Sequence, residues 1–170
     1  MKKTKTIAVT AVFTAMYFVL SAMLKIPVTG HITLDLGYIA LTVGAVYLGA
    51  VPAMLIGSVG ALLESALMSQ RGVSPGWILM NAIVGFFCGL VLHRAAEDRK
   101  KLMTSAFIVV PLSMLVGVTV KTLVDCVLYD IPVIAKIPSS GMAFLCDSVV
   151  MLAAGLPLSI ALKKRIRQFK

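Results

Sequence analysis

Residues 36–63 contain no charged side chain, and this stretch constrains the fold more than any other feature of the sequence. A helix crosses the roughly 30 Å hydrocarbon core of a bilayer in about 20 residues, so the stretch is too long for a single crossing. Gly49 and Pro52 supply a break, because proline lacks a backbone N–H and disfavours a helical residue before it. We predict two spans joined by a tight uncharged turn, with a re-entrant segment as the competing interpretation.

The composition is that of an integral membrane protein. Of the 170 residues, 59% are hydrophobic and only 14% are charged, and the mean hydropathy is +1.00. A soluble domain has about 45–50% apolar and about 25% charged residues. We expect one transmembrane domain over residues 1–170 with an all-α fold, a six-helix bundle. Its predicted spans cover about residues 6–24, 34–49, 52–69, 75–92, 105–129 and 141–162.

The basic residues indicate the orientation of these spans. With six spans, both termini lie on the same side of the membrane as the turn near residue 50 and the connection after residue 92. Twelve of the sixteen Lys and Arg residues fall on that side, and the other side has only Lys25, Arg71 and Lys136. Cytoplasmic loops carry an excess of Lys and Arg, so we predict that both termini are cytoplasmic. Topology thus accounts for the net charge of +9, and no nucleic-acid partner is predicted.

Ionisable residues inside the spans fall in the halves nearer the outer side. These residues are Glu64, Lys121, Asp125 and Asp147. An uncompensated charge in the hydrocarbon core costs on the order of several kcal/mol. At a rise of about 1.5 Å per residue, each lies within about two turns of the outer end of its helix, as does Asn81. Four helices therefore offer polar groups at one level, which predicts a small polar pocket that opens outward and binds a ligand.

Structural roles compete with ligand contact at these positions. Lys121 and Asp125 are four residues apart, so they share a helix face and can neutralise each other. Glu64 and Asp147 have no partner within their own helices, and a neighbouring helix or protonation is the structural alternative for each. We expect Asp35, like Asp130, to sit at a helix end and to be solvated.

Aromatic residues and proline-containing connections surround the predicted pocket. Trp77 stands at an outer boundary, where interfacial anchoring is the usual role and stacking on a flat ligand ring is the functional alternative. Tyr38 and Tyr129 also lie near the outer side and could extend an aromatic wall. The connections at residues 25–35 and 130–140 contain proline, and we expect semi-rigid loops there that cover the pocket.

Motifs for several chemistries are absent from the sequence. It contains no P-loop, no HExxH and no GxSxG motif. Cys88, Cys126 and Cys146 lie in apolar stretches without CxxC spacing, which is typical of reduced packing residues. We expect no catalytic residues, no metal site and no cofactor, and predict that the protein is not an enzyme.

Small residues recur at four-residue spacing in two spans. Ala11 and Ala15, preceded by Ala8, share one face of the first span, and Gly85 and Gly89 share a face of the fourth. Such faces let helix backbones approach closely in lipid. Packing inside the bundle is the alternative to a partner surface for each.

Several segments together resemble a known family. They are the Ala11-xxx-Ala15 face, Ile32-Thr-Leu-Asp35, the apolar stretch from Tyr47 to Gly60, Ser74-Pro-Gly-Trp77, Asn81-Ala-Ile-Val-Gly85 and a basic C-terminal tail. The pattern resembles the substrate-binding S-components of energy-coupling factor (ECF) transporters, which import vitamins and related micronutrients in prokaryotes. The likeness covers essentially the whole chain and rests on size, span number and loop character.

The resemblance implies a binding subunit in the prokaryotic cell membrane. Its pocket would be closed by the first and third outer connections, and it would topple in the bilayer to release its cargo inside. Ala8, Ala11 and Ala15 would dock on a transmembrane coupling subunit, and two cytoplasmic ATPases would use ATP. The expected substrate-binding residues are Glu64, Trp77, Asn81, Lys121, Asp125 and Asp147.

The polar level also indicates what kind of vitamin would bind. Carboxylates outnumber lysine there, which favours an aminopyrimidine or pyridine vitamer over folate or pantothenate, because an anion would need more than Arg71 and Lys121. A stand-alone proton-coupled carrier of a small polar metabolite, with Glu64 or Asp147 as its proton site, is the alternative. Such carriers usually show inverted repeats, and no convincing repeat is present here. A structural subunit without ligand is a third class.

Overall fold

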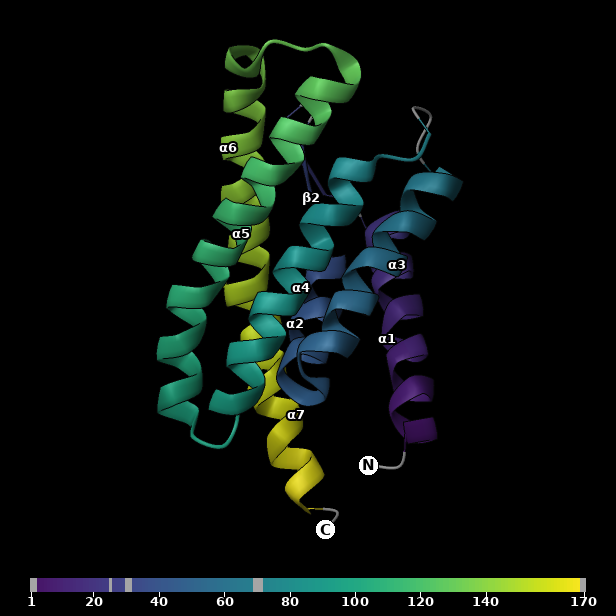
Figure 1. Ribbon diagram of the computed structural model, residues 1–170. Coiled ribbons are helices and arrows are strands. Elements are labelled where there is room, and N and C mark those ends of the chain that lie inside the picture. Colours follow the sequence, from purple (N-terminus) through teal and green to yellow (C-terminus); the bar gives the residue numbers. More distant parts are fainter. Residues whose placement is uncertain (1–2, 25, 30–31, 69–71, 169–170) are drawn as a thin grey trace.

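The computed structural model describes residues 3–24, 26–29, 32–68 and 72–168. In this part of the chain, helices form an elongated bundle with roughly parallel long axes (Figure 1). The elements are α1 (Lys3–Met23), β1 (Ile26–Thr29), β2 (Ile32–Leu34), α2 (Gly37–Leu48), α3 (Ala50–Met68), α4 (Pro75–Ala95), α5 (Arg99–Tyr129), α6 (Val133–Val150), the π-helix η1 (Met151–Gly155) and α7 (Leu156–Gln168).

Five of the described helical segments are long and apolar enough to cross a membrane. They are α1, α3, α4, α5 and the continuous rod made by α6, η1 and α7. The second predicted span is shorter than expected, because α2 has 12 residues and about 18 Å of length. It is buried along most of its length against α1, α3, α4 and α7, as expected for a helix that is apolar on every side. The all-α prediction is therefore confirmed for the bundle, with five candidate spans and one short buried helix.

Two outer connections differ from the predicted loops. The strands β1 and β2 pair antiparallel, with Ile26 opposite Leu34, and we call this pair the hairpin; the following helix begins at Gly37. Residues 133–140 are helical, because α6 begins at Val133 directly after Pro132. A proline just before a helix removes no intrahelical hydrogen bond, since the first N–H groups have no partner there. Pro138 is accommodated inside α6.

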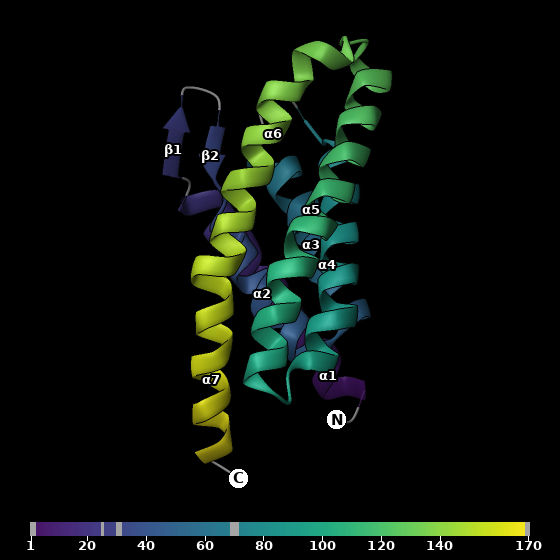
Figure 2. The same cartoon turned by 90° about the vertical axis from the view of Figure 1, so that its left-hand side faces the viewer.

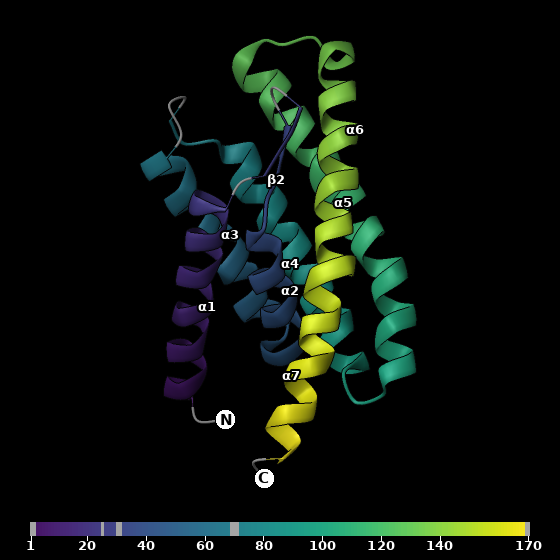
Figure 3. The same ribbon diagram turned by 180° about the vertical axis from the view of Figure 1, so that it is seen from behind.

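One end of the bundle gathers most of the basic residues. The start of α1, the α4–α5 connection and the end of α7 all lie there (Figures 1 and 3). The α2–α3 turn lies there too, because Nδ1 of His93 near the end of α4 is 3.0 Å from the Val46 carbonyl oxygen. This turn is formed at Gly49, whose φ of 88° favours glycine. We call this the basic end; the hairpin and the α5–α6 connection mark the opposite end.

The two small-residue patterns have different surroundings. Gly85 packs within the bundle, because a Cβ placed on it would lie only 2.4 Å from the Ala53 carbonyl oxygen on α3. Ala8, Ala11 and Ala15 are all exposed on α1. The glycine pattern therefore brings α3 and α4 together, whereas the alanine face is exposed in the described part of the chain.

Candidate functional site

A buried polar cluster occupies the half of the bundle toward the opposite end. Its members come from α1, α3, α4, α5, α6 and the segment before α2. Glu64, Asn81, Asp125 and Asp147 are each no more than 7% exposed. The structure thus brings together the polar residues that the sequence placed at one depth.

Asn81 links α1 to α4 at the centre of the cluster. Its Oδ1 accepts a hydrogen bond of 3.0 Å from the Tyr17 hydroxyl, and its Nδ2 donates to the Trp77 carbonyl oxygen at 2.9 Å. Both ends of the amide are therefore engaged, which fixes its orientation. Tyr17 was not predicted as a site residue, although it lies one helical turn before Ser21 on the face of α1 that packs inward.

Trp77 forms part of the wall of the cluster. Its indole Nε1 donates to Oε2 of Glu64 at 3.3 Å. The Tyr38 ring meets the indole edge-on with centroids 6.4 Å apart, and Nζ of Lys121 lies 6.0 Å from the indole centroid. The half-buried indole thus contacts an acid, a cation and an aromatic ring. Tyr38 is completely buried, whereas Tyr129 is half exposed.

Asp125 on α5 pairs with two lysines, and one of them, Lys136, joins α5 to α6. Nζ of Lys121 lies 3.2 Å and Nζ of Lys136 lies 3.0 Å from the same oxygen, Oδ2. The predicted pairing of Lys121 with Asp125 is confirmed. Lys136 was placed in an outer loop by the sequence, and it reaches Asp125 because residues 133–140 are helical.

Asp35 is buried, and the expectation that it would be solvated is wrong. It is 4% exposed, and its Oδ1 accepts hydrogen bonds from the Ser21 hydroxyl and from the Gly37 N–H at 2.8 Å. The Asp147 carboxylate in turn accepts a hydrogen bond from the Asp35 backbone. The hairpin directs the chain into the bundle at this point, which a reading of local sequence does not show. Asp130 is exposed, as expected.

Acceptors dominate the interior of the cluster. The carboxylates of Asp35, Glu64 and Asp147 all lie close enough to interact electrostatically with the Tyr38 hydroxyl. That hydroxyl is buried and makes no hydrogen bond within the part of the chain that the structure describes. A cluster of this kind suits a partner that brings N–H or O–H donors.

The cluster is closed on the side of the hairpin. β2 packs on α6, and the hairpin stands beside α6 at the opposite end (Figure 2). The hydrogen bond from the backbone of Asp35, which directly follows β2, to the Asp147 carboxylate also joins this segment to α6. Arg71, which the sequence placed near this mouth, lies outside the described residues.

Several apolar helices enclose acids and aromatic rings in one half of the bundle, and this architecture defines a multi-pass membrane protein with a buried polar cluster. Comparison with known proteins specifies the class further. The family model described as "ECF-type riboflavin transporter, S component" matches residues 1–164. The chain belongs to this family of transporter components, as the resemblance predicted, and is a multi-pass protein of the cell membrane.

One curated protein is similar to part of this chain. The UPF0397 protein of Onion yellows phytoplasma (strain OY-M) is 31% identical over 108 residues, which are 64% of this chain. The chain spans 56% of the length of that relative.

Proposed function

We propose that this chain is the high-affinity binding subunit for a small water-soluble vitamin or vitamin precursor, which it delivers to an ATP-driven ECF import complex. The observation that carries the proposal is the buried polar cluster, since apolar surroundings hold acids only where they have partners or a ligand. The proposed substrate-binding residues are Glu64, Trp77, Asn81, Lys121, Asp125 and Asp147, together with Tyr38.

The cluster favours a flat ring compound that carries hydrogen-bond donors. Glu64 and Asp147 would accept hydrogen bonds from those donors. The Tyr38 hydroxyl would form a hydrogen bond with the bound ligand. Riboflavin, named in the family description, combines a flat ring with a chain of hydroxyl groups and is the first compound to test. Aminopyrimidine and pyridine vitamers are the alternatives that the residues themselves favour.

Entry of the substrate requires the closed cluster to open. The hairpin and α6 cover it and are linked through Asp35 and Asp147. Separation of these two elements would expose Asp147 to the outer side without unfolding the helices around it. The first and third outer connections would then act as the lid, as the family resemblance implies.

The partner surface in this proposal is the exposed alanine face of α1. Ala8, Ala11 and Ala15 would contact the transmembrane coupling subunit, because small side chains permit close helix approach in lipid. Two cytoplasmic ATPases would supply the energy, and the chain itself would use no cofactor.

Mass spectrometry of small molecules released from the gently purified protein tests the binding function. We expect one vitamin to be enriched consistently, and Trp77 fluorescence to change when that compound is titrated into ligand-free protein. Glu64→Gln should weaken its binding, whereas Glu97→Gln, at an exposed position near the basic end, should not. A panel of vitamins that leaves the fluorescence unchanged would contradict the proposal. Uptake by the chain alone in proteoliposomes, driven by a pH gradient, would favour the stand-alone carrier.

A further inference from the structure

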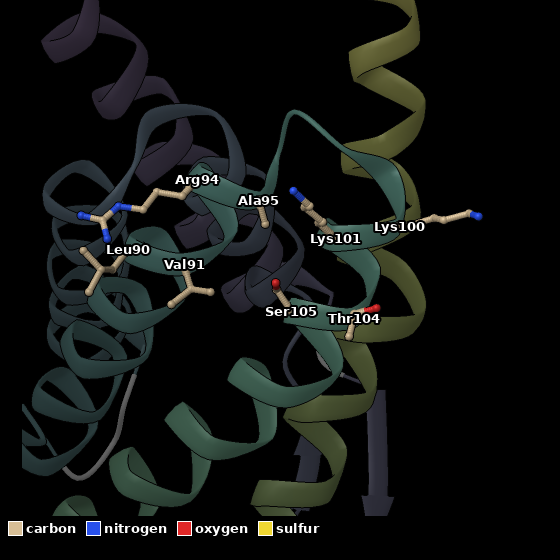
Figure 4. A pocket seen from close by; sticks show the side chains of 8 residues that line it. All are labelled: Leu90, Val91, Arg94, Ala95, Lys100, Lys101, Thr104 and Ser105. Atoms are coloured by element: carbon tan, nitrogen blue, oxygen red, sulfur yellow. The ribbon is translucent and has the colours of Figure 1, made fainter.

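A hollow of about 550 Å³ lies at the basic end between α4 and α5, far from the polar cluster (Figure 4). It is formed where the end of α4 and the start of α5 meet their short connection. We call it the basic hollow, and its lining consists of Leu90, Val91, Arg94, Ala95, Lys100, Lys101, Thr104 and Ser105.

Cations and hydroxyl groups line its rim. Arg94 lies on the α4 side and Lys101 on the α5 side, with Thr104 and Ser105 one turn further along α5, and the side chains of Arg94 and Lys100 extend toward opposite sides of the view (Figure 4). In the part of the chain that the structure describes, neither Arg94 nor Lys101 forms an ion pair. The nearby carboxylate of Asp98 accepts a hydrogen bond of 2.9 Å from the Lys100 N–H and so caps α5.

Apolar residues continue from this rim toward the middle of the bundle. Leu90 and Val91 form the α4 side of the hollow. On α5, Ile108 and Leu112 follow Ser105 at spacings of three and four residues, so they share its helix face, and both are exposed. Phe87 is exposed one turn before Val91 on α4. An exposed apolar surface, which includes Phe87, Ile108 and Leu112, therefore extends from the basic hollow toward the middle of the bundle; we call it the apolar track.

We propose that the basic hollow binds the phosphate headgroup of an anionic phospholipid, with the acyl chains along Phe87, Ile108 and Leu112. Basic pockets between transmembrane helices bind such headgroups, and each Lys or Arg near the surface contributes about fivefold in affinity. A soluble phosphate compound would use the cations but leave the apolar track uncovered. The inference rests on the chain spanning a membrane and does not depend on vitamin binding.

Native mass spectrometry of the full-length protein in detergent tests this site. Titration with phosphatidylglycerol and phosphatidylcholine should show preferential binding of phosphatidylglycerol. The double variant Arg94→Gln/Lys101→Gln should weaken phosphatidylglycerol binding by about 25-fold, which is about fivefold for each charge removed. Lys5→Gln is the matched control, because Lys5 is exposed at the same end on α1 and lies outside the hollow. Equal binding of both lipids, or a loss of about fivefold in this single-charge control, would overturn the proposal.

A second variant separates the hollow from general charge attraction. Thr104→Trp keeps both cations but fills the hollow from an exposed position, and it should also weaken phosphatidylglycerol binding. Unchanged binding in this variant would show that the lipid is held elsewhere. Glycerol 3-phosphate, added as a competitor at the lipid's concentration, should displace little lipid. If glycerol 3-phosphate displaced the bound lipid as effectively as added phosphatidylglycerol does, the hollow would be a site for free phosphate compounds. That result would overturn the assignment to lipid.

Discussion

Asp125 on α5 forms an ion pair with Lys136 on α6 and so connects the last two long helical segments. One of its oxygens accepts from ammonium groups on α5 and on α6, and each lysine keeps 24% of its side-chain surface exposed. Gly76 on α4 leaves room for the other oxygen, because a Cβ there would lie 2.6 Å from Oδ1. The carboxylate therefore sits at the meeting point of three helices.

Removal of this charge should cost more than removal of either cation. Asp125→Asn leaves two ammonium groups without their counter-charge, and we expect it to lower the free energy of unfolding by about 1–3 kcal/mol. Lys136→Met should cost less, because Lys121 still neutralises the acid. Thermal unfolding of the ligand-free protein in detergent measures both effects. A larger loss in Lys136→Met than in Asp125→Asn would show that Asp125 is not the shared partner.

Local spacing made some of these contacts predictable and left others hidden. The pairing of Lys121 with Asp125 follows from a separation of four residues on one helix. The pairing of Lys136 with Asp125 and the burial of Asp35 depend on how the outer connections fold, and composition identified these only as polar and proline-containing. The depth of polar residues along the helices was sufficient to predict the cluster. It was not sufficient to predict that Asp35 and Lys136 also belong to it.

At the scale of elements, the same spacing of small residues serves two purposes. Gly85 lies against the α3 backbone, and Ala11 and Ala15 face outward from α1. No feature of the four-residue spacing distinguishes an internal helix contact from a free face. The distinction comes from the neighbours, because α1 contacts α2 and α3 through its opposite side, where Tyr17 and Ser21 are buried.

Gly85 should not tolerate a side chain. Gly85→Ala places a methyl group against the Ala53 carbonyl oxygen, so α3 and α4 must separate, and overpacking of this kind costs about 1–3 kcal/mol. Gly141→Ala in α6 is the matched control, because nothing lies within 4 Å of its Cβ position. The control should leave the melting temperature unchanged or raise it, since alanine favours a helix over glycine. Equal effects of the two substitutions would argue against a close α3–α4 contact.

Larger side chains on the alanine face of α1 should leave folding intact, unlike a side chain at Gly85. Ala11→Trp or Ala15→Trp adds bulk to an exposed surface, so folding and vitamin binding should be retained. Uptake by cells that contain the coupling subunit and ATPases should be lost, because the helix could no longer approach its partner closely. Met16→Trp, exposed on a different face of α1, should preserve uptake. A loss of vitamin binding in Ala11→Trp would instead indicate that the face packs internally.

Hydrophobic length predicted most of the helical elements but not their ends near the outer side. Gly49 and Pro52 correctly indicated the separation of α2 from α3. The prediction of semi-rigid loops at the two proline-containing connections is wrong where the structure has β1, β2 and the helical start of α6, because proline content alone does not distinguish a loop from a strand pair or a helix start. Pro132 precedes the first helical turn, where proline removes no hydrogen bond.

The whole molecule is polarised along its long axis. Buried acids and aromatic rings occupy one half, and the basic residues and the chain ends lie at the other end. The proposed vitamin site and the proposed lipid site therefore fall on different sides of the membrane. This separation would let the subunit bind its cargo at one surface while contacts with lipid and partners form at the other.

The orientation of this axis can be tested with single cysteines. In a background with Cys88→Ala, Cys126→Ala and Cys146→Ala, Ser139→Cys places a thiol on the exposed start of α6 and Lys5→Cys places one near the start of α1. Because Lys and Arg concentrate on the cytoplasmic side, a membrane-impermeant maleimide added to intact cells should label only the thiol at position 139. The thiol at position 5 should react after permeabilisation. The reverse pattern would place the basic end outside. Labelling of both thiols in intact cells would show that positions 5 and 139 lie on the same side, which contradicts the predicted odd number of crossings between them.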